Sequence, residues 1–300
     1  MINPFTQIHQ EKQYLQLIRN IMYFGEKRQT RNSVTKSIFG AHMRFSLKNN
    51  TIPFITTKKL AWKSCFNELF WFIRGKTDES WLRNRRVHIW KDNASRDFLD
   101  KYGFTYRKEG DLGPIYGHQW RHFNARYDTC DTDYSNQGVD QLNRVIRVLS
   151  GKDEKENKYS RRLIVSAWNP EQLQDMALPP CHVLYQFYVN NNDELSCALY
   201  QRSGDVGLGV PFNIASYSLL THLIAKHVGL KAGEFVYNLG DCHIYENHED
   251  ALKEQLEREP KPFPKISIVN TYKTIDEYDI CDIRIHDYKY WPSINMKMIA

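Results

Sequence analysis

The sequence lacks the features that mark secreted, membrane-spanning and disulfide-linked proteins. Its 300 residues include six cysteines, but no two of them form a Cys-x-x-Cys pair, so we expect reduced thiols. The N-terminal segment shows no signal-peptide pattern, and no apolar run approaches the length of a membrane span. We therefore expect a cytoplasmic protein without membrane contact, and the sequence leaves entry into the nucleus open.

Common ligand-binding motifs are missing as well. The glycines between residues 204 and 209 do not have dinucleotide-binding spacing, and there is no P-loop. Cys242, His243 and His248 fit neither a helical His-x-x-x-His pair nor a zinc knuckle, so we expect no metal site. The net charge of +6 is spread over short basic clusters, which suits a small anionic ligand at least as well as nucleic acid.

The hydrophobic pattern alternates between helical and strand periods, without an internal repeat or an obvious linker. This indicates a single α/β or α+β domain over residues 1–300. Residues 25–37 are predicted to be a polar loop. The pattern predicts helices over 14–22, 61–73, 139–149, 212–228 and 247–257, and strands over 37–40, 43–45, 163–168, 183–189, 195–200 and 235–245.

One stretch presents a thiol at the entrance of a predicted strand. The prolines at 179–180 fix the backbone just before Cys181 and donate no backbone hydrogen bond. The Cys181 side chain is therefore expected at the entrance of the strand over 183–189 and not within its hydrogen-bond ladder. Such a cysteine becomes a nucleophile when a cation lowers its pKa, and the arginines at 161–162 and Arg202 are candidates. A buried structural cysteine is the alternative interpretation.

The most apolar predicted helix, over 61–73, contains one carboxylate. Glu68 falls between Trp71 and Phe72 on the helix surface. Burial disfavours a charged carboxylate, so we expect a raised pKa, as a general acid or base requires. A glutamate that reaches solvent at the helix edge is an equally weighted alternative.

The segment from Gln201 to Asp205 combines an amide, a cation, a hydroxyl and a carboxylate. Arg202 and Ser203, next to the small Gly204, suit a phosphate dianion because a guanidinium binds phosphate through two hydrogen bonds. Asn213, in the first turn of the helix over 212–228, is a candidate ligand-binding amide, with helix capping as its alternative role.

Several motifs in one order resemble the thymidylate synthase family, and the match runs from about Tyr14 to Ala300. The resemblance implies an α+β fold, a single domain whose large mixed β-sheet is flanked by helices and pairs sheet-on-sheet in a dimer. The excursion near Asp133 and Tyr134 is most similar to the eukaryotic and large-DNA-virus members. The motifs are TTK at 56–58, NEL at 67–69 with WF at 71–72, GPIYG at 113–117, PPCH at 179–182, YQRSGD at 200–205, GVPFNIASY at 209–217 and GDCHIY at 240–245.

The resemblance implies reductive methylation of dUMP to dTMP by 5,10-methylenetetrahydrofolate, which leaves dihydrofolate. The folate supplies both the carbon and the hydride, so neither a nicotinamide nor a metal is expected, and DNA is not an expected partner. Cys181 would add to C6 of the uracil, Glu68 would act through water, and Tyr116 would assist removal of the C5 proton. The catalytic residues implied are Cys181, Glu68, Tyr116, Arg202, Asp205 and Asn213.

The resemblance also implies the binding residues and a homodimer. Arg161 and Arg162 would cross the subunit boundary to the partner's phosphate. The arginine loop near Arg31 is one residue shorter than usual in the family and lacks its glycines, with Arg28 as a fallback, and the C-terminal tail also departs from the family pattern. The residues implied for dUMP are Arg31, Arg161, Arg162, Gln201, Arg202, Ser203, Gly204, Asp205, Asn213, His243 and Tyr245. Those implied for folate are Lys58, Ile89, Trp90, Asp205, Phe212 and Ile299.

Two other functions are compatible with such a scaffold. A dCMP hydroxymethylase-like enzyme would carry an aspartate in place of Asn213, because cytosine presents N4–H₂ as a donor and N3 as an acceptor. An inactive relative retained as a binding protein, for example for RNA, would keep the fold without turnover. Residue 213 discriminates against the first function, and an activity measurement tests the second.

Overall fold

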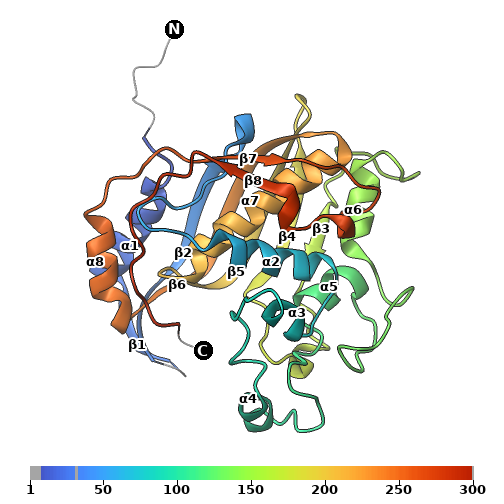
Figure 1. Ribbon diagram of the computed structural model, residues 1–300, viewed down its shortest axis with the longest axis horizontal. Coiled ribbons are helices and arrows are strands. Elements are labelled where there is room, and N and C mark those ends of the chain that lie inside the picture. Colours follow the sequence, from blue (N-terminus) through green and yellow to red (C-terminus); the bar gives the residue numbers. More distant parts are fainter. Residues whose placement is uncertain (1–7, 31–32, 299–300) are drawn as a thin grey trace.

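The computed structural model describes residues 8–30 and 33–298, which build a six-stranded mixed sheet with helices packed on it (Figure 1). The strand order is β1-β2-β6-β5-β4-β3, and neighbours run antiparallel except β5 and β6, which are parallel. The expected α+β fold with a large mixed sheet is therefore confirmed. The strands are β1 Glu26–Gln29, β2 Val34–Ser46, β3 Ile164–Ser166, β4 His182–Val189, β5 Glu194–Asp205, β6 Lys231–Tyr245, β7 Lys265–Ile268 and β8 Ile283–His286, of which β7 and β8 form a separate pair.

The helices include one that is buried nearly all round, α7, which lies against β5 and β6. It ends at Gly229, whose φ of 75° suits the left-handed position after a helix. No helix in the described ranges is long and apolar enough to cross a membrane. The α-helices are α1 Lys12–Phe24, α2 Trp62–Ile73, α3 Ser80–Arg83, α4 Arg96–Lys101, α5 Tyr116–His122, α6 Gln141–Leu149, α7 Gly209–Val228 and α8 Glu249–Leu256. The 3₁₀ turns are Lys48–Asn50, Leu173–Asp175, Glu246–His248, Ile275–Glu277 and Ile280–Asp282.

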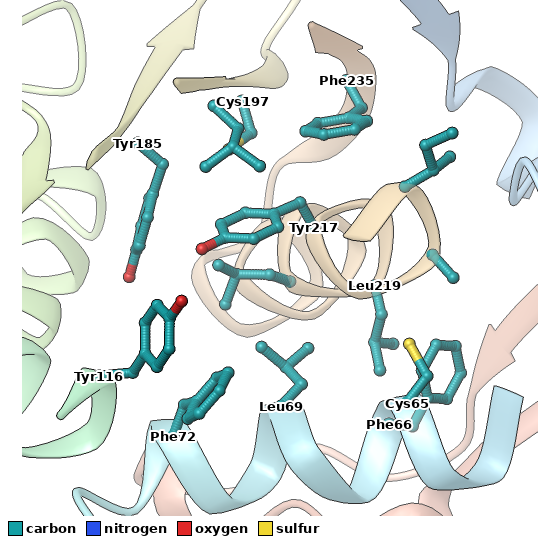
Figure 2. Packing of buried hydrophobic residues seen from close by; sticks show 14 of the residues in the cluster. Cys65, Phe66, Leu69, Phe72, Tyr116, Tyr185, Cys197, Tyr217, Leu219 and Phe235 are labelled. Atoms are coloured by element: carbon teal, nitrogen blue, oxygen red, sulfur yellow. The ribbon is translucent and has the colours of Figure 1, made fainter. Parts of the chain in front are cut away.

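The core that supports the site lies between α2, α7 and the sheet (Figure 2). The apolar stripe of α2 faces α7, as its spacing predicts, and includes Phe66 and Leu69. From α7, Tyr217 stacks on Phe235 of β6 with ring centroids 6.1 Å apart. Because α2 is held on α7 in this way, the position of Glu68 is set by core packing.

Two predictions for the N-terminal third were wrong. Residues 25–37, predicted as a polar loop, contain β1 and the start of β2, which pair as a hairpin. The strands predicted over 37–40 and 43–45 are one continuous strand, β2. Gly40 interrupts the apolar pattern with a φ of 87°, but pairing with β6 continues on both sides of it, which keeps the strand intact.

Candidate active site

The pairing of β4 with β5 brings Cys181 next to Arg202. The Arg202 N–H donates to the Cys181 carbonyl at 2.9 Å. Its guanidinium turns back to the preceding turn, where Nε donates to Pro180 O at 2.8 Å and Nη2 donates to Pro179 O at 2.9 Å. The guanidinium carbon also lies 5.6 Å from the centre of the Trp168 ring system. Arg202 therefore holds the turn that presents the thiol.

Arg202 has the predicted effect on the pKa of the Cys181 thiol and lowers it, but burial of the sulfur has a larger effect of opposite sign and raises the pKa above its ordinary value. The prediction took account of the nearby charge and neglected the loss of solvent. The pKa of Cys181 is thus a balance in which burial outweighs the predicted cation.

Tyr116, the first residue of α5, contacts the backbone of Cys181. Its phenol oxygen accepts a hydrogen bond from the Cys181 N–H at 2.7 Å and lies 3.4 Å from the His182 nitrogen. The ring is buried, with its centroid 4.7 Å from that of Phe72 and 6.1 Å from that of Trp90. Burial raises the pKa of Tyr116 well above its ordinary value, so the phenol keeps its proton next to the thiol.

Glu68 is buried, so the solvent-facing alternative for this residue is wrong. Burial raises the pKa of its carboxyl to about 7, and this effect outweighs a 2.7 Å hydrogen bond that Trp90 Nε1 donates to Oε1. The expected raised pKa is therefore confirmed. Trp90 stands between Glu68 and Tyr116 and links the carboxyl to the side of the site that contains the thiol.

Two amides lie beside the thiol and share one partner. Gln201 Nε2 donates to Ser203 O at 2.8 Å, and Tyr237 Oη donates to Gln201 Oε1 at 2.6 Å. The same hydroxyl lies 3.3 Å from Asn213 Oδ1. Because α7 begins at Gly209, Asn213 lies inside the helix, and its alternative role as a helix cap is wrong.

Gly204 leaves room for this arrangement. A Cβ at this position would lie 2.9 Å from a methyl carbon of Leu239 and 3.1 Å from one of Val210. It would also lie 3.4 Å from Gln201 Nε2. A larger residue at 204 would therefore push apart β5, β6 and the start of α7.

Asp205 and Lys58 form the next part of the cluster. Asp205 Oδ1 accepts hydrogen bonds from the N–H groups of Gly207 at 2.8 Å and Leu208 at 3.3 Å. Lys58 is buried and donates through Nζ to Gly207 O. Burial lowers the pKa of Lys58 to about 8, and the charge of Asp205 opposes this shift.

The parallel pairing of β5 and β6 adds His243 and Tyr245 to the cluster. His243 lies opposite Asp205 in the register, and its Nδ1 is 3.1 Å from Asp241 Oδ1. The ring of Tyr245 meets that of His243 edge-on, with centroids 5.3 Å apart. Ser203 pairs with Asp241 on the same ladder, so several residues implied for dUMP converge at one end of these strands.

Two of the apolar residues implied for folate pack against the core. Ile89 and Phe212 are partly buried, and the Phe212 carbonyl accepts a contact from Cys65 Sγ at 3.2 Å. Ile299 lies outside the described residues.

The predicted phosphate arginines are not brought to the cluster. Arg161 and Arg162 lie near β4 at Gln186, whose Nε2 donates to Arg161 O at 3.1 Å. The Arg162 side chain is 79% exposed. Arg31 lies outside the described residues.

Arg28, the fallback for Arg31, has other partners. It pairs with Glu26 at 2.8 Å and lies 3.9 Å from Asp241. Two acidic neighbours therefore already partner its charge in this chain.

Sequence reasoning missed Tyr237 and Trp168, which touch predicted site residues. Tyr237 belongs to a strand pattern that also describes an ordinary core tyrosine, so no local signal separates it from the core. Within the described ranges, no group of three or more His, Cys, Asp or Glu side chains is placed to hold a metal ion.

Comparison with known proteins gives a consistent result. A family model described as thymidylate synthase matches residues 12–300. The chain is 53% identical to human thymidylate synthase, over 97% of this chain and 91% of the human protein. It is 49% identical to thymidylate synthase of human herpesvirus 8, over 97% of this chain and 84% of the viral protein. It is also 52% identical to the bifunctional dihydrofolate reductase-thymidylate synthase of Leishmania major, over 97% of this chain but only 55% of that protein.

Proposed function

The chain belongs to the thymidylate synthase family, and we propose that Cys181 is the nucleophile with which it carries out the family's reaction. It is a methyltransferase that converts dUMP to dTMP by reductive methylation. The co-substrate, 5,10-methylenetetrahydrofolate, supplies the one-carbon unit and the hydride when bound. The observation that carries the proposal is the presentation of Cys181 on a turn held by Arg202, beside the buried Tyr116 and Glu68.

The proposed chemistry divides between the thiol and the two buried acids. Cys181 loses its proton to water, and the thiolate sulfur forms a bond to C6 of the uracil while the electrons of the C5=C6 double bond move toward C5 and O4. The neutral phenol of Tyr116 lies beside the thiol, where it assists removal of the C5 proton. Glu68, with its pKa near 7, both takes and gives protons through water near neutral pH. Asp205 is included among the catalytic residues because its carboxylate holds the backbone N–H groups of Gly207 and Leu208.

Asn213 is proposed to read the base. Its amide offers a donor for uracil O4 and an acceptor for N3–H, and it stabilises the negative charge that develops on O4. An aspartate here would suit cytosine, so the asparagine favours uracil over the hydroxymethylase alternative. The remaining dUMP contacts are assigned to Arg31, Gln201, Arg202, Ser203, Gly204, Asp205, His243 and Tyr245.

The folate is assigned to the opposite side of the thiol from the phosphate. Trp90 stands next to Glu68, so a ring placed there would lie beside the proton donor. The buried Lys58 stands at the Asp205 loop, where its charge would meet an anionic or carbonyl group of the folate. The residues assigned to folate are Lys58, Ile89, Trp90, Asp205, Phe212 and Ile299.

A homodimer completes the phosphate site in this proposal. Burial alternates along β5 and β6, which is typical of a sheet with one covered face. Large apolar side chains on the sheet are exposed in the single chain, including Phe39 at 84% and Tyr188 at 65%. Sheet-on-sheet pairing would cover them and bring Arg161 and Arg162 of the partner subunit to the phosphate.

We also propose that residues 1–300 are one catalytic domain. A single apolar core joins residues from Tyr14 to Ile283, which supports this division. The six free thiols support a cytoplasmic location, with nuclear entry open.

Tritium release from 5-tritiated dUMP with methylenetetrahydrofolate tests the function. We expect release that matches dihydrofolate formation, and loss of both in Cys181→Ser. Cys130→Ser is the matched control, because Cys130 is also a half-buried free thiol but lies outside the cluster. Release without dihydrofolate would indicate hydroxymethyl transfer, and no release from a folded wild-type dimer would leave a binding protein.

A further inference from the structure

Tyr237 is a buried residue of β6 on which the two amides of the site converge. Its hydroxyl lies 2.6 Å from Gln201 Oε1 and 3.3 Å from Asn213 Oδ1. The Asn213 amide also hydrogen-bonds the ring of His182, whereas Gln201 Oε1 has no other hydrogen-bond partner among the described residues. Loss of this hydroxyl would leave the buried Gln201 oxygen without a donor and would remove one of the two groups that hold the Asn213 amide, the other being His182.

The hydroxyl is fixed before any ligand binds. The ring of Tyr237 is fully buried and packs on Phe235 with centroids 5.4 Å apart. Gln201 Nε2 donates to Ser203 O, and a carbonyl only accepts, so the Gln201 oxygen must face the phenol. Burial raises the pKa of Tyr237 well above its ordinary value, so the phenol stays a donor throughout the working pH range.

We propose that Tyr237 is a positioning residue that sets the preference of the site for uracil over cytosine by holding the Asn213 amide. This inference rests on the proposed function, in which Asn213 binds the base edge. Uracil presents N3–H as a donor and O4 as an acceptor, whereas cytosine presents the reverse pattern. An amide held in one orientation complements one of these bases, and an amide free to turn complements both.

The test compares two buried phenols that differ in their partners. Tyr237→Phe removes a hydroxyl that contacts Gln201 and Asn213, whereas Tyr185→Phe removes one without a hydrogen-bond partner. Binding of dUMP and of dCMP to each intact dimer is measured by calorimetry. We expect the ratio of the two affinities to fall about tenfold in Tyr237→Phe and to stay at the wild-type value in Tyr185→Phe. A wild-type ratio in a folded Tyr237→Phe protein would overturn the proposal.

Coupling to Asn213 separates positioning from a general loss of structure. In the Asn213→Ala background, the added Tyr237→Phe change is expected to have no further effect on the ratio, because the amide that it positions is gone. An equal further loss in that background would contradict the proposal.

A second variant covers failure of Tyr237→Phe to fold. Tyr237→His keeps a ring with an N–H donor, and we expect it to retain a preference for dUMP. Loss of that preference in a folded Tyr237→His protein would contradict the proposal. Binding is read without turnover, so absence of tritium release in the wild type would count against the proposed reaction alone and leave this comparison readable.

Discussion

The proposed site has a base side, with Glu68, Tyr116 and Asn213, and a phosphate side, with Arg28, Arg161 and Arg162. The two sides differ in how much of each is complete within one chain. On the base side, Glu68, Tyr116 and Asn213 are buried, and each has a recorded hydrogen-bond partner. On the phosphate side, the Arg162 side chain is 79% exposed, and Arg28 is already paired with Glu26. The base side is thus pre-organised by packing. On the phosphate side, the arginine side chains are either exposed to solvent or paired with an acidic residue of the same chain.

This difference indicates which physical effect determines the properties of each side: desolvation on the base side, and charge interactions with the ligand on the phosphate side. Buried groups on the base side have pKa values shifted by desolvation, which is a property of the folded chain and needs no ligand. Exposed arginines have little interaction energy until a dianion and a second subunit exclude water around them. Substitutions on the base side are therefore expected to affect the site of the same chain. Substitutions of the arginines on the phosphate side are expected to affect the site of the partner subunit.

The largest expected effect concerns Glu68 on the base side. Glu68→Gln keeps the shape but neither takes nor gives a proton, so we expect the rate of tritium release to fall by about 10²–10⁴. The affinity for dUMP is expected to change little, because the carboxyl acts in the proton transfers. An activity within tenfold of the wild type would show that another group performs these transfers.

The same substitution is expected to stabilise the protein at alkaline pH. The folded pKa of Glu68, about 7, lies above the ordinary value of 4.5, so the folded state binds the proton more tightly. This contribution to stability is fully present below pH 4.5 and is lost as the pH rises to about 7. At pH 8, Glu68→Gln should unfold with a free energy up to about 3 kcal/mol larger than the wild type, and with no difference near pH 4. Glu259→Gln, on an 82% exposed side chain, is the denaturation control and should show no such dependence.

The next largest effect concerns the phosphate side. Arg161→Ala with Arg162→Ala should lower kcat/KM about a hundredfold, because charge-assisted hydrogen bonds to the phosphate are lost. Mixing this double variant with Cys181→Ser should restore about a quarter of the wild-type activity, since half of the dimers are mixed and each has one intact site.

The control for this experiment pairs two base-side variants. A mixture of Glu68→Gln with Cys181→Ser should stay inactive, because both groups serve the site of their own chain. Restoration in the control mixture, or none in the arginine mixture, would contradict the division between the two halves.

Sequence patterns predicted the direction of the pKa shift of Glu68 but not that of Cys181. The period of α2 places Glu68 among aromatic side chains, and this local signal was sufficient for its raised pKa. The thiol of Cys181 was different, because its pKa depends on a balance between burial and Arg202 that only the assembled strands determine. Tyr237 was missed for a related reason, since its partners Gln201 and Asn213 come from other elements.

The fold shows the same limit. Two long apolar helices were predicted near their observed bounds, α2 with its apolar stripe and α7, which is apolar on nearly all sides and ends at Gly229. The hairpin of β1 and β2 was missed, because β1 is exposed along its whole length and has no alternating pattern. Its strand character comes from pairing with β2, which a local pattern does not contain.

The smallest expected effect tests how finely packing tunes the base side. Trp90 Nε1 donates to Glu68 Oε1 at 2.7 Å, and this bond holds the pKa of the carboxyl below the value that burial alone would give. Trp90→Phe keeps an aromatic ring but removes the donor, so the pKa of Glu68 should rise further, by about one unit. The limb of the pH–rate profile that depends on Glu68 should move to higher pH by that amount. Trp62→Phe is the control, because Trp62 packs on Phe66 of the same helix and has no recorded contact with Glu68. If the limb does not move in Trp90→Phe, burial alone determines the pKa of Glu68, and the hydrogen bond from Trp90 makes no measurable contribution to it.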